Sequence, residues 1–313
     1  MNDETTNNNS TNKESFIEFN ILEIISFAKG KIIYIFAITF IFGLISVAYS
    51  LYLPNKYLSS AQFEIVQKSE KSSMSSLSEV GGLISGIGLS SPNSDRSSLI
   101  VGIAQSRLFF KKINSNNNLA PLLMAAESYD LSSKAIAFDK NEYNSNTNTW
   151  IRKPPSGRAV KPTYLEAYLD YRKVLTISKN KKTGFISISV EHVSPIFAKE
   201  LIEIIWNNVN NVIREKDMKE SFEALDYLNS ELLKTTNSNI RQSINNLISI
   251  KLETQMLTKI KKDYVLDPID LPYVPEVKSS PKRSLIFILG TIIGFLIAVS
   301  LTILQYMHKK LEG

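Results

Sequence analysis

The chain has 313 residues, of which 43% are hydrophobic and 21% are charged, and its formal net charge is +6. This length allows one large domain or two ordinary ones. The sequence has no cysteine, which excludes disulfides, thiolate metal ligands and a cysteine nucleophile. Lys and Arg are scattered rather than clustered, so we expect no nucleic-acid partner.

Two apolar runs without charged residues occur near the ends of the chain, at 32–53 and 285–304. About 20 apolar residues suffice to cross a hydrocarbon core of roughly 30 Å as a helix. The first run is too long for a cleaved signal peptide, it follows about thirty polar or amphipathic residues, and no A-x-A site follows it. The sequence therefore predicts two uncleaved transmembrane helices.

The flanking charges predict the orientation of these helices. Basic residues occur on the terminal side of both runs, at Lys29, Lys31, His308, Lys309 and Lys310. By the positive-inside rule, both termini should be cytoplasmic. Lys282 and Arg283 oppose this assignment, but a long intervening segment is translocated largely regardless of its charge. The main domain is thus expected outside the cytoplasm.

The segments around the first run have mixed patterns. Residues 14–30 show apolar positions at helical spacing, which fits either a surface helix or an extension of the first span. Residues 57–67 are rich in aromatic and β-branched residues and predict a strand. The glycine-rich run 80–89 is not followed by Lys-Ser or Lys-Thr, so we expect an apolar loop or a subunit contact rather than a phosphate loop.

The middle of the chain alternates between helical and extended patterns. Residues 95–113 predict one helix, with Leu99, Ile103, Leu108 and Phe109 on its apolar face. A second helix is predicted at 163–175. Strands are predicted at 176–178 and at 185–190, where the alternating pattern FISISV indicates a half-buried strand, and the two should form a hairpin.

A long run with helical periodicity begins at Ser194, a plausible N-cap, followed by Pro195 at the first helical position. The periodicity weakens at 234–239 and then resumes to 260. One continuous helix of about 65 residues would be roughly 100 Å long and would have to project and pack on neighbours. The alternative is two antiparallel helices that break at the Asn-Ser turn.

The segment DPIDLPYVPEVKSSPKRS follows this helical region. Its four prolines cannot belong to one helix, so we expect a stiff extended connector that leads into the second span.

Signatures of catalysis are missing from the sequence. H-E-x-x-H, G-x-S-x-G, Walker A and EF-hand patterns do not occur. We expect His192 to be an exposed strand-end residue, and Glu200 and Glu203 to be solvated charges. Neither span carries an ionisable residue, which argues against an ion pathway. The sequence thus predicts no enzyme, no catalytic residues, no cofactor and no metal site.

The connector and the second span together carry a motif. The pattern P-x-x-P-x-x-x-x-S-P-K is followed by G-x-x-x-G, and its residues are Pro272, Pro275, Ser280, Pro281, Lys282, Gly290 and Gly294. This resembles the polysaccharide co-polymerases, the Wzz-type chain-length determinant proteins of Gram-negative bacteria. That family often has a further proline where Ser284 stands here. The segments TGFISISVEHVSPIFAKE and DRSSLIVGIAQSRLFFKKI resemble the family's base domain and its entry into the long helix.

The resemblance implies an α+β fold, in which a membrane-proximal α/β periplasmic domain carries a long projecting helix and is flanked by two transmembrane helices. It also implies a homo-oligomeric ring in the bacterial inner membrane. Such a ring would act with a Wzy-type polymerase on a growing glycan chain on its lipid carrier, and would set the modal length of O-antigen or a related surface polysaccharide. An adaptor of an ABC-transporter polysaccharide export system is the alternative function.

The glycine pair is expected to give the second span a close contact with neighbouring subunits or the polymerase, whereas the first span is expected to be only an anchor. The expected segments are a cytoplasmic N-terminal segment at 1–31, transmembrane helices at 32–53 and 284–305, a periplasmic domain at 54–283 (base 54–193, helical region 194–264, Pro-rich connector 265–283), and a cytoplasmic tail at 306–313.

Overall fold

A computed structural model describes residues 27–66 and 92–312 of the chain. It divides into two compact units, Met1–Leu53 with Lys282–Gly313 and Pro54–Pro281. We call them the membrane-helix unit and the central domain. The predictions for most of the segment 14–30 and for the loop 80–89 lie outside the described residues.

The membrane-helix unit contains two long apolar helices, α2 (Ile32–Tyr52) and α11 (Arg283–Glu312). Both are long and apolar enough to cross a membrane. The 21 residues of α2 give a length of about 32 Å, close to the thickness of the hydrocarbon core. The two predicted spans are thus confirmed as helices, and the chain has the form of a membrane-anchored, two-pass protein.

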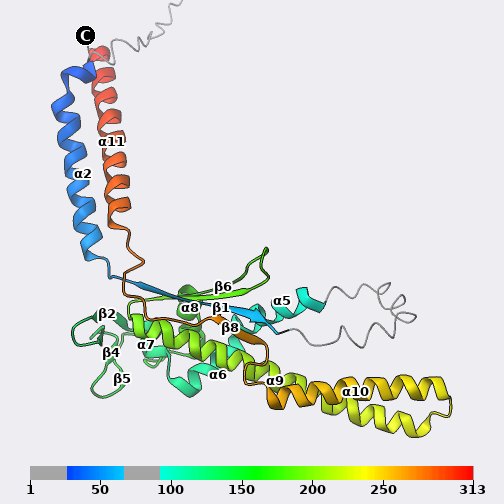
Figure 1. The fold of residues 1–313 in the computed structure, drawn as a ribbon. Helices are drawn as coiled ribbons and strands as arrows, with labels where there is room; N and C mark the ends of the chain where they lie inside the picture. The colour runs from blue at the N-terminus through cyan, green and yellow to red at the C-terminus, as the bar shows by residue number, and fades with distance from the viewer. Residues whose placement is uncertain (1–26, 67–91, 313) are drawn as a thin grey trace, which may run out of the picture. The chain divides into compact units, whose positions relative to one another are not determined.

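The central domain is built on a four-stranded antiparallel sheet with the order β6-β7-β1-β8 (Figure 1). Along β1 and β7, buried and more exposed residues alternate, as expected for strands with one face on a core. The predicted first strand and the predicted hairpin are both confirmed. The four strands are β1 (Tyr57–Ile65), β6 (Leu175–Lys179), β7 (Ile186–His192) and β8 (Leu266–Asp270).

Strand β8 was not predicted, because its sequence LDPID was assigned to the extended connector. In the structure β8 pairs with β1, and Pro268 lies opposite Phe63. Proline cannot donate a hydrogen bond to a sheet, but it is tolerated here because β8 is an edge strand.

Helix α9 (Pro195–Lys234) covers one face of the sheet with its first half. Ser194 caps this helix by accepting a hydrogen bond from the Phe197 N–H (3.2 Å), as its sequence position predicted. The core between helix and sheet is formed by fully buried apolar side chains, including Phe63, Ile186, Ile188, Leu201, Ile202 and Ile205.

The prediction of one continuous helix at 95–113 is wrong, because the structure has two helices there. α5 (Pro92–Ala104) ends before Ser106, which caps α6 (Arg107–Asn117). The tyrosines of α8 (Tyr164–Val174) stabilise this break: the Tyr171 hydroxyl donates to the Ala104 carbonyl (2.7 Å), and Tyr168 does the same to Gln105 (2.7 Å). Burial raises the pKa of Tyr171, so it stays a donor.

The break also changes the apolar face of this region. Leu108 was expected in the core but is 78% exposed, whereas Phe109, Phe110 and Ile113 of α6 are buried. A short helix and two small hairpins complete the domain: α7 (Ala120–Met124), β2 (Ala126–Asp130) with β3 (Ala135–Phe138), and β4 (Tyr143–Asn144) with β5 (Thr149–Trp150).

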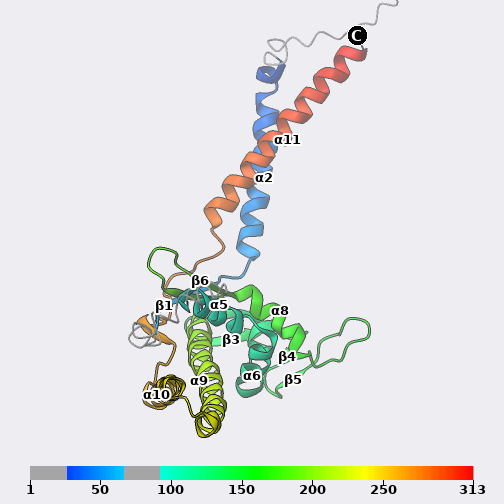
Figure 2. The ribbon, with the colours of Figure 1, turned by 90° about the vertical axis from the view of Figure 1, so that its right-hand side faces the viewer.

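The long helical region is a hairpin rather than one continuous helix. α9 ends at Lys234, and α10 (Ser238–Ile260) runs back along its distal half (Figure 1); Figure 2 shows the two helices side by side, nearly end-on. Asn237 caps α10 by accepting hydrogen bonds from the N–H groups of Asn239 (2.9 Å) and Ile240 (3.4 Å). The alternative of two antiparallel helices is therefore confirmed.

His192 is buried, with 5% of its surface exposed, so the expectation of an exposed histidine is wrong. Its Nδ1 accepts a hydrogen bond from the Ser194 N–H (3.0 Å). Its Nε2 must therefore carry the proton, which it donates to the Leu122 carbonyl (2.8 Å). Burial outweighs these bonds and lowers the pKa of His192 from 6.5 to about 4.

This histidine should make stability depend on pH. Above pH 6.5 it is neutral in both the folded and the unfolded chain, whereas below that value only the unfolded chain gains a proton. Stability should therefore fall as pH drops through the interval from 6.5 to about 4. We expect a loss of about 1 kcal/mol between roughly pH 7.5 and 5.5.

The measurement is urea unfolding of the full chain in detergent, followed by the fluorescence of Trp150 and Trp206, both in the central domain. The control is His192→Gln, which has no titrating group and should show a flatter profile over this interval. Equal pH slopes in the two proteins would contradict the assignment.

Candidate functional site

The Pro-rich connector is held against the central domain at several points, although Glu276 to Lys278 are exposed. Pro272 and Pro275 are buried. Between them, the Tyr273 carbonyl accepts a hydrogen bond from the hydroxyl of Ser59 in β1 (2.6 Å). The connector is thus fixed to the sheet. The sequence predicted an extended connector but not its contacts with the sheet.

The end of the connector is fixed by a carboxylate that sequence reasoning did not identify as part of the site. The hydroxyls of Ser279 and Ser280 both donate to Oε1 of Glu191, at 2.7 and 2.9 Å. Glu191 is in β7, 88 residues away from Ser279, so no local pattern relates them. A charged acceptor makes stronger hydrogen bonds than a neutral one, so this contact ties the connector to the sheet.

Backbone hydrogen bonds join the same point to the start of the domain. The Lys56 N–H donates to the Ser280 carbonyl (2.9 Å), and the Ser279 N–H donates to the Lys56 carbonyl (2.8 Å). The chain therefore enters and leaves the central domain at adjacent positions. Pro281 follows this pair directly, and the carbonyl of Lys282 accepts the first backbone bonds of α11.

In the membrane-helix unit, Gly290 and Gly294 face α2 of the same chain. A Cβ atom at Gly294 would lie 2.5 Å from the Cβ of Phe42, and a Cβ at Gly290 would overlap the side chain of Ser46. The Ser46 hydroxyl donates to the Ile286 carbonyl (2.7 Å), a contact that this close approach permits. We had expected this face to meet a neighbouring subunit or the polymerase, but the structure fills it with the chain's own first span.

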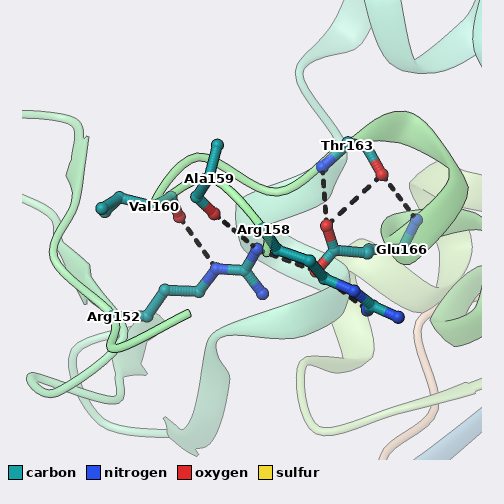
Figure 3. A network of polar contacts seen from close by, with 6 residues as sticks. All are labelled: Arg152, Arg158, Ala159, Val160, Thr163 and Glu166. Atoms are coloured by element: carbon teal, nitrogen blue, oxygen red, sulfur yellow. Dashed lines mark hydrogen bonds and ion pairs between the residues drawn. The ribbon is translucent and has the colours of Figure 1, made fainter. Parts of the chain in front are cut away.

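A second polar cluster lies between α8 and the loop before it (Figure 3). Arg152 is 7% exposed; its Nη2 pairs with Glu166 Oε2 (2.8 Å), and its Nε donates to the Val160 carbonyl (2.8 Å). Glu166 also forms a capping box with Thr163. Burial acts to raise the pKa of Glu166, but the hydrogen bond from Arg152 and the one from the Thr163 backbone outweigh it, so the pKa is lowered.

These contacts hold the loop before α8 in place. Over residues 27–66 and 92–312, no group of three His, Asp or Glu residues could hold a metal ion. Glu203 pairs with Lys199 on α9 (3.1 Å), and Glu200 is exposed.

No family model matches the chain, and no curated protein matches it. Among solved structures, a full-length bacterial polysaccharide co-polymerase is similar to it with a TM-score of 0.39 and 13% identity, over 93% of this chain and 99% of that one. A fragment of WzzB, a polysaccharide co-polymerase from Salmonella Typhimurium, has a TM-score of 0.30 and 14% identity, over 72% and 100%.

Both names are those of the family that the connector motif resembles. The expected α+β fold class, with a long helix and two apolar helices flanking the central domain, is confirmed by the elements described above.

The Glu191 contact should stabilise the connector. Replacing Glu191 with Ala removes the acceptor of two hydroxyls, and we expect it to lower the free energy of unfolding by about 1–3 kcal/mol. It should also speed amide exchange at Ser279. The matched control is Glu200→Ala, which removes an exposed carboxylate and should change stability by less than about 0.5 kcal/mol. Unaltered exchange at Ser279 in Glu191→Ala would contradict the role.

The glycine face can be tested with cysteines, because the chain has none of its own. Phe27 and Tyr306 have ring centroids 5.5 Å apart, so cysteines at these two positions should be joined by a short thiol cross-linker. Gly290→Leu with Gly294→Leu should overpack the contact and reduce cross-linking by about half or more. The control is Ser300→Leu at an exposed position on α11. Equal cross-linking in both would show that the glycines do not hold the spans together.

Proposed function

We propose that the chain is a two-pass protein of the bacterial inner membrane that regulates the modal length of O-antigen or a related surface polysaccharide. It acts as a non-enzymatic, homo-oligomeric scaffold with a Wzy-type polymerase, while the glycan grows on its lipid carrier. Both termini lie in the cytoplasm and the central domain in the periplasm, in agreement with the basic residues that flank the spans on the terminal side.

The observation that carries this proposal is the exposed apolar surface of the hairpin. Thr254 and Thr258 of α10 are buried, whereas Leu252, Met256 and Ile260, on the other side of α10, are 46%, 60% and 74% exposed. These three residues recur every four positions and form one apolar row. A row of this kind on a projecting helix is covered when copies of the chain associate, which supports an oligomeric scaffold.

The connector and the paired spans support the same proposal. Pro272 to Lys282 and the glycine pair resemble the motif of the chain-length determinant proteins. The Glu191 contact fixes the connector to the sheet at the point where the chain leaves the central domain. A change in the packing of the sheet would therefore act directly on the connector. The segment boundaries given above for the cytoplasmic, membrane and periplasmic parts belong to this proposal.

An adaptor of an ABC-transporter polysaccharide export system is the second candidate. The observation that favours it is the helical hairpin itself, because such an adaptor needs a long periplasmic projection. The two candidates differ in their membrane partner. Co-purification with an ABC ATPase, rather than with a multi-span polymerase, would favour the adaptor.

Deletion of the gene tests the proposal directly. We expect the length distribution of the surface polysaccharide on a gel to lose its preferred length, and the wild-type gene to restore it. An unchanged ladder in a strain that makes one would refute the function.

Complementation with hairpin variants tests whether the apolar row of α10 is an interface between subunits. Leu252→Ser with Met256→Ser should reduce the oligomer mass of the purified protein, measured by light scattering, and should fail to restore the preferred length. The matched control is Gln242→Ser with Asn246→Ser, which replaces two exposed polar residues of the same helix. If both double variants keep the wild-type mass, the row is not an interface.

A further inference from the structure

An open surface pocket of about 520 Å³, which we call the cavity, lies where the end of α10 returns to α9, at the base of the hairpin. Its volume is within the range of about 300–1,000 Å³ that small-ligand sites occupy. The residues that line it are Asn207, Asn210, Asn211, Arg214, Thr258, Lys259, Ile260, Lys261 and Lys262.

The α9 side of the cavity belongs to a run of four asparagines, WNNVNN, although asparagine is a poor helix former. Two of the four have a structural function. The Asn210 Oδ1 accepts the N–H groups of Val265 (2.8 Å) and Leu266 (2.9 Å), and Asn208 donates to the Ile204 carbonyl (2.8 Å). These hydrogen bonds explain why asparagine occurs at 208 and 210, but they do not explain Asn207 and Asn211.

The other two asparagines are exposed and present amide groups to the cavity. Within the described parts of the chain, the Asn207 side chain forms no hydrogen bond, and Asn211 uses only its oxygen, which accepts from Arg214 Nη1 (2.8 Å). Their N–H₂ groups are therefore available as donors to a ligand.

Arg214 is held in a fixed position. Besides Asn211, it donates through Nη2 to the carbonyls of Lys261 (3.0 Å) and Lys262. These carbonyls follow the C-terminal end of α10, where backbone oxygens carry partial negative charge. Arg214 therefore offsets part of that charge.

The cavity has an excess of positive charge. Lys259, Lys261 and Lys262 are exposed, and none of the three forms an ion pair within the described residues. None of the lining residues is acidic. Glu215, next to Arg214, is paired with Lys112 on α6 (3.1 Å). Three exposed ammonium groups without an ion-pair partner around one cavity attract an anion.

We propose that this cavity binds an acidic stretch of the glycan, with a sugar carboxylate at the lysines and sugar hydroxyls at the two asparagines. Cationic side chains form charge-assisted hydrogen bonds with carboxylates, and amide groups suit hydroxyl oxygens. The inference rests on the proposed function and adds the chemical class of the glycan and the place where the scaffold contacts it.

The test is calorimetric titration of the full chain in nanodiscs of zwitterionic lipid. The probes are tetragalacturonate, the neutral maltotetraose, and inorganic pyrophosphate as a mimic of the lipid carrier's head group. Tetragalacturonate should bind about tenfold more tightly than maltotetraose or pyrophosphate. Lys261→Gln with Lys262→Gln should weaken that binding by about tenfold.

The matched control is Lys181→Gln with Lys182→Gln, an adjacent pair of exposed lysines in the β6–β7 turn. It should change the affinity by less than about twofold. An equal loss in both double variants would show non-specific attraction and overturn the site. No binding of tetragalacturonate, or equal binding of maltotetraose, would overturn the acidic-glycan assignment, and tighter binding of pyrophosphate would assign the cavity to the lipid carrier instead.

Binding to the purified protein does not depend on length control in cells. A chain that restores the polysaccharide ladder but does not bind tetragalacturonate would therefore refute this site and leave the proposed function intact. A chain that binds tetragalacturonate without affecting the ladder would refute the function instead.

Discussion

The pairing of β1 with two distant strands holds the central domain together. β1 follows the first span directly, yet its partners are β7 and β8, which lie more than a hundred residues further along the chain. Its buried residues Ala61 and Phe63 also belong to the core that α9 covers. The sheet therefore joins the beginning and the end of the domain, and the connector leaves beside the point where the chain enters.

The connector depends on that pairing. Glu191 lies opposite Leu58 in the register of β7 and β1, and its carboxylate accepts hydrogen bonds from Ser279 and Ser280. Tyr273 is bonded to Ser59, the neighbouring residue on β1. Because Ser279 and Ser280 are also bonded to the backbone of Lys56, which precedes β1, the Glu191 contact requires β1 and β7 to be in this register. The connector's course thus follows from the sheet rather than from the stiffness of its prolines alone.

Hydrophobic periodicity and composition were sufficient to predict the elements that these local features determine. The spans, β1, the β6–β7 hairpin and α8 all have periodicity or composition that does not depend on distant partners. The break between α5 and α6 has one local sign, the N-cap Ser106, which the apolar periodicity across it obscures, and it is stabilised by Tyr168 and Tyr171, more than sixty residues away. β8 was hidden by Pro268, which a central strand would exclude but an edge strand accepts.

The same distinction applies to the candidate sites. The connector motif and the glycine pair are visible in the sequence, but the sequence does not say what they touch. Glu191 as the acceptor and α2 as the partner of the glycines come only from the tertiary structure. His192 was misjudged for the same reason, because its strand-end position suggests exposure, while the Leu122 carbonyl that receives its proton lies 70 residues away.

The unequal lengths of the hairpin helices relate the fold to the proposed scaffold. α9 has 40 residues and α10 has 23, so the sheet packs against the first part of α9 and only the remainder is paired with α10. A pair of helices beyond the sheet has no core of its own on its outer sides, which is why the row with Leu252 and Met256 stays exposed. The basic cavity lies at the junction of the two parts, where α10 ends and the chain turns into β8. Binding there would act on the base of the hairpin and on the strand that leads to the connector.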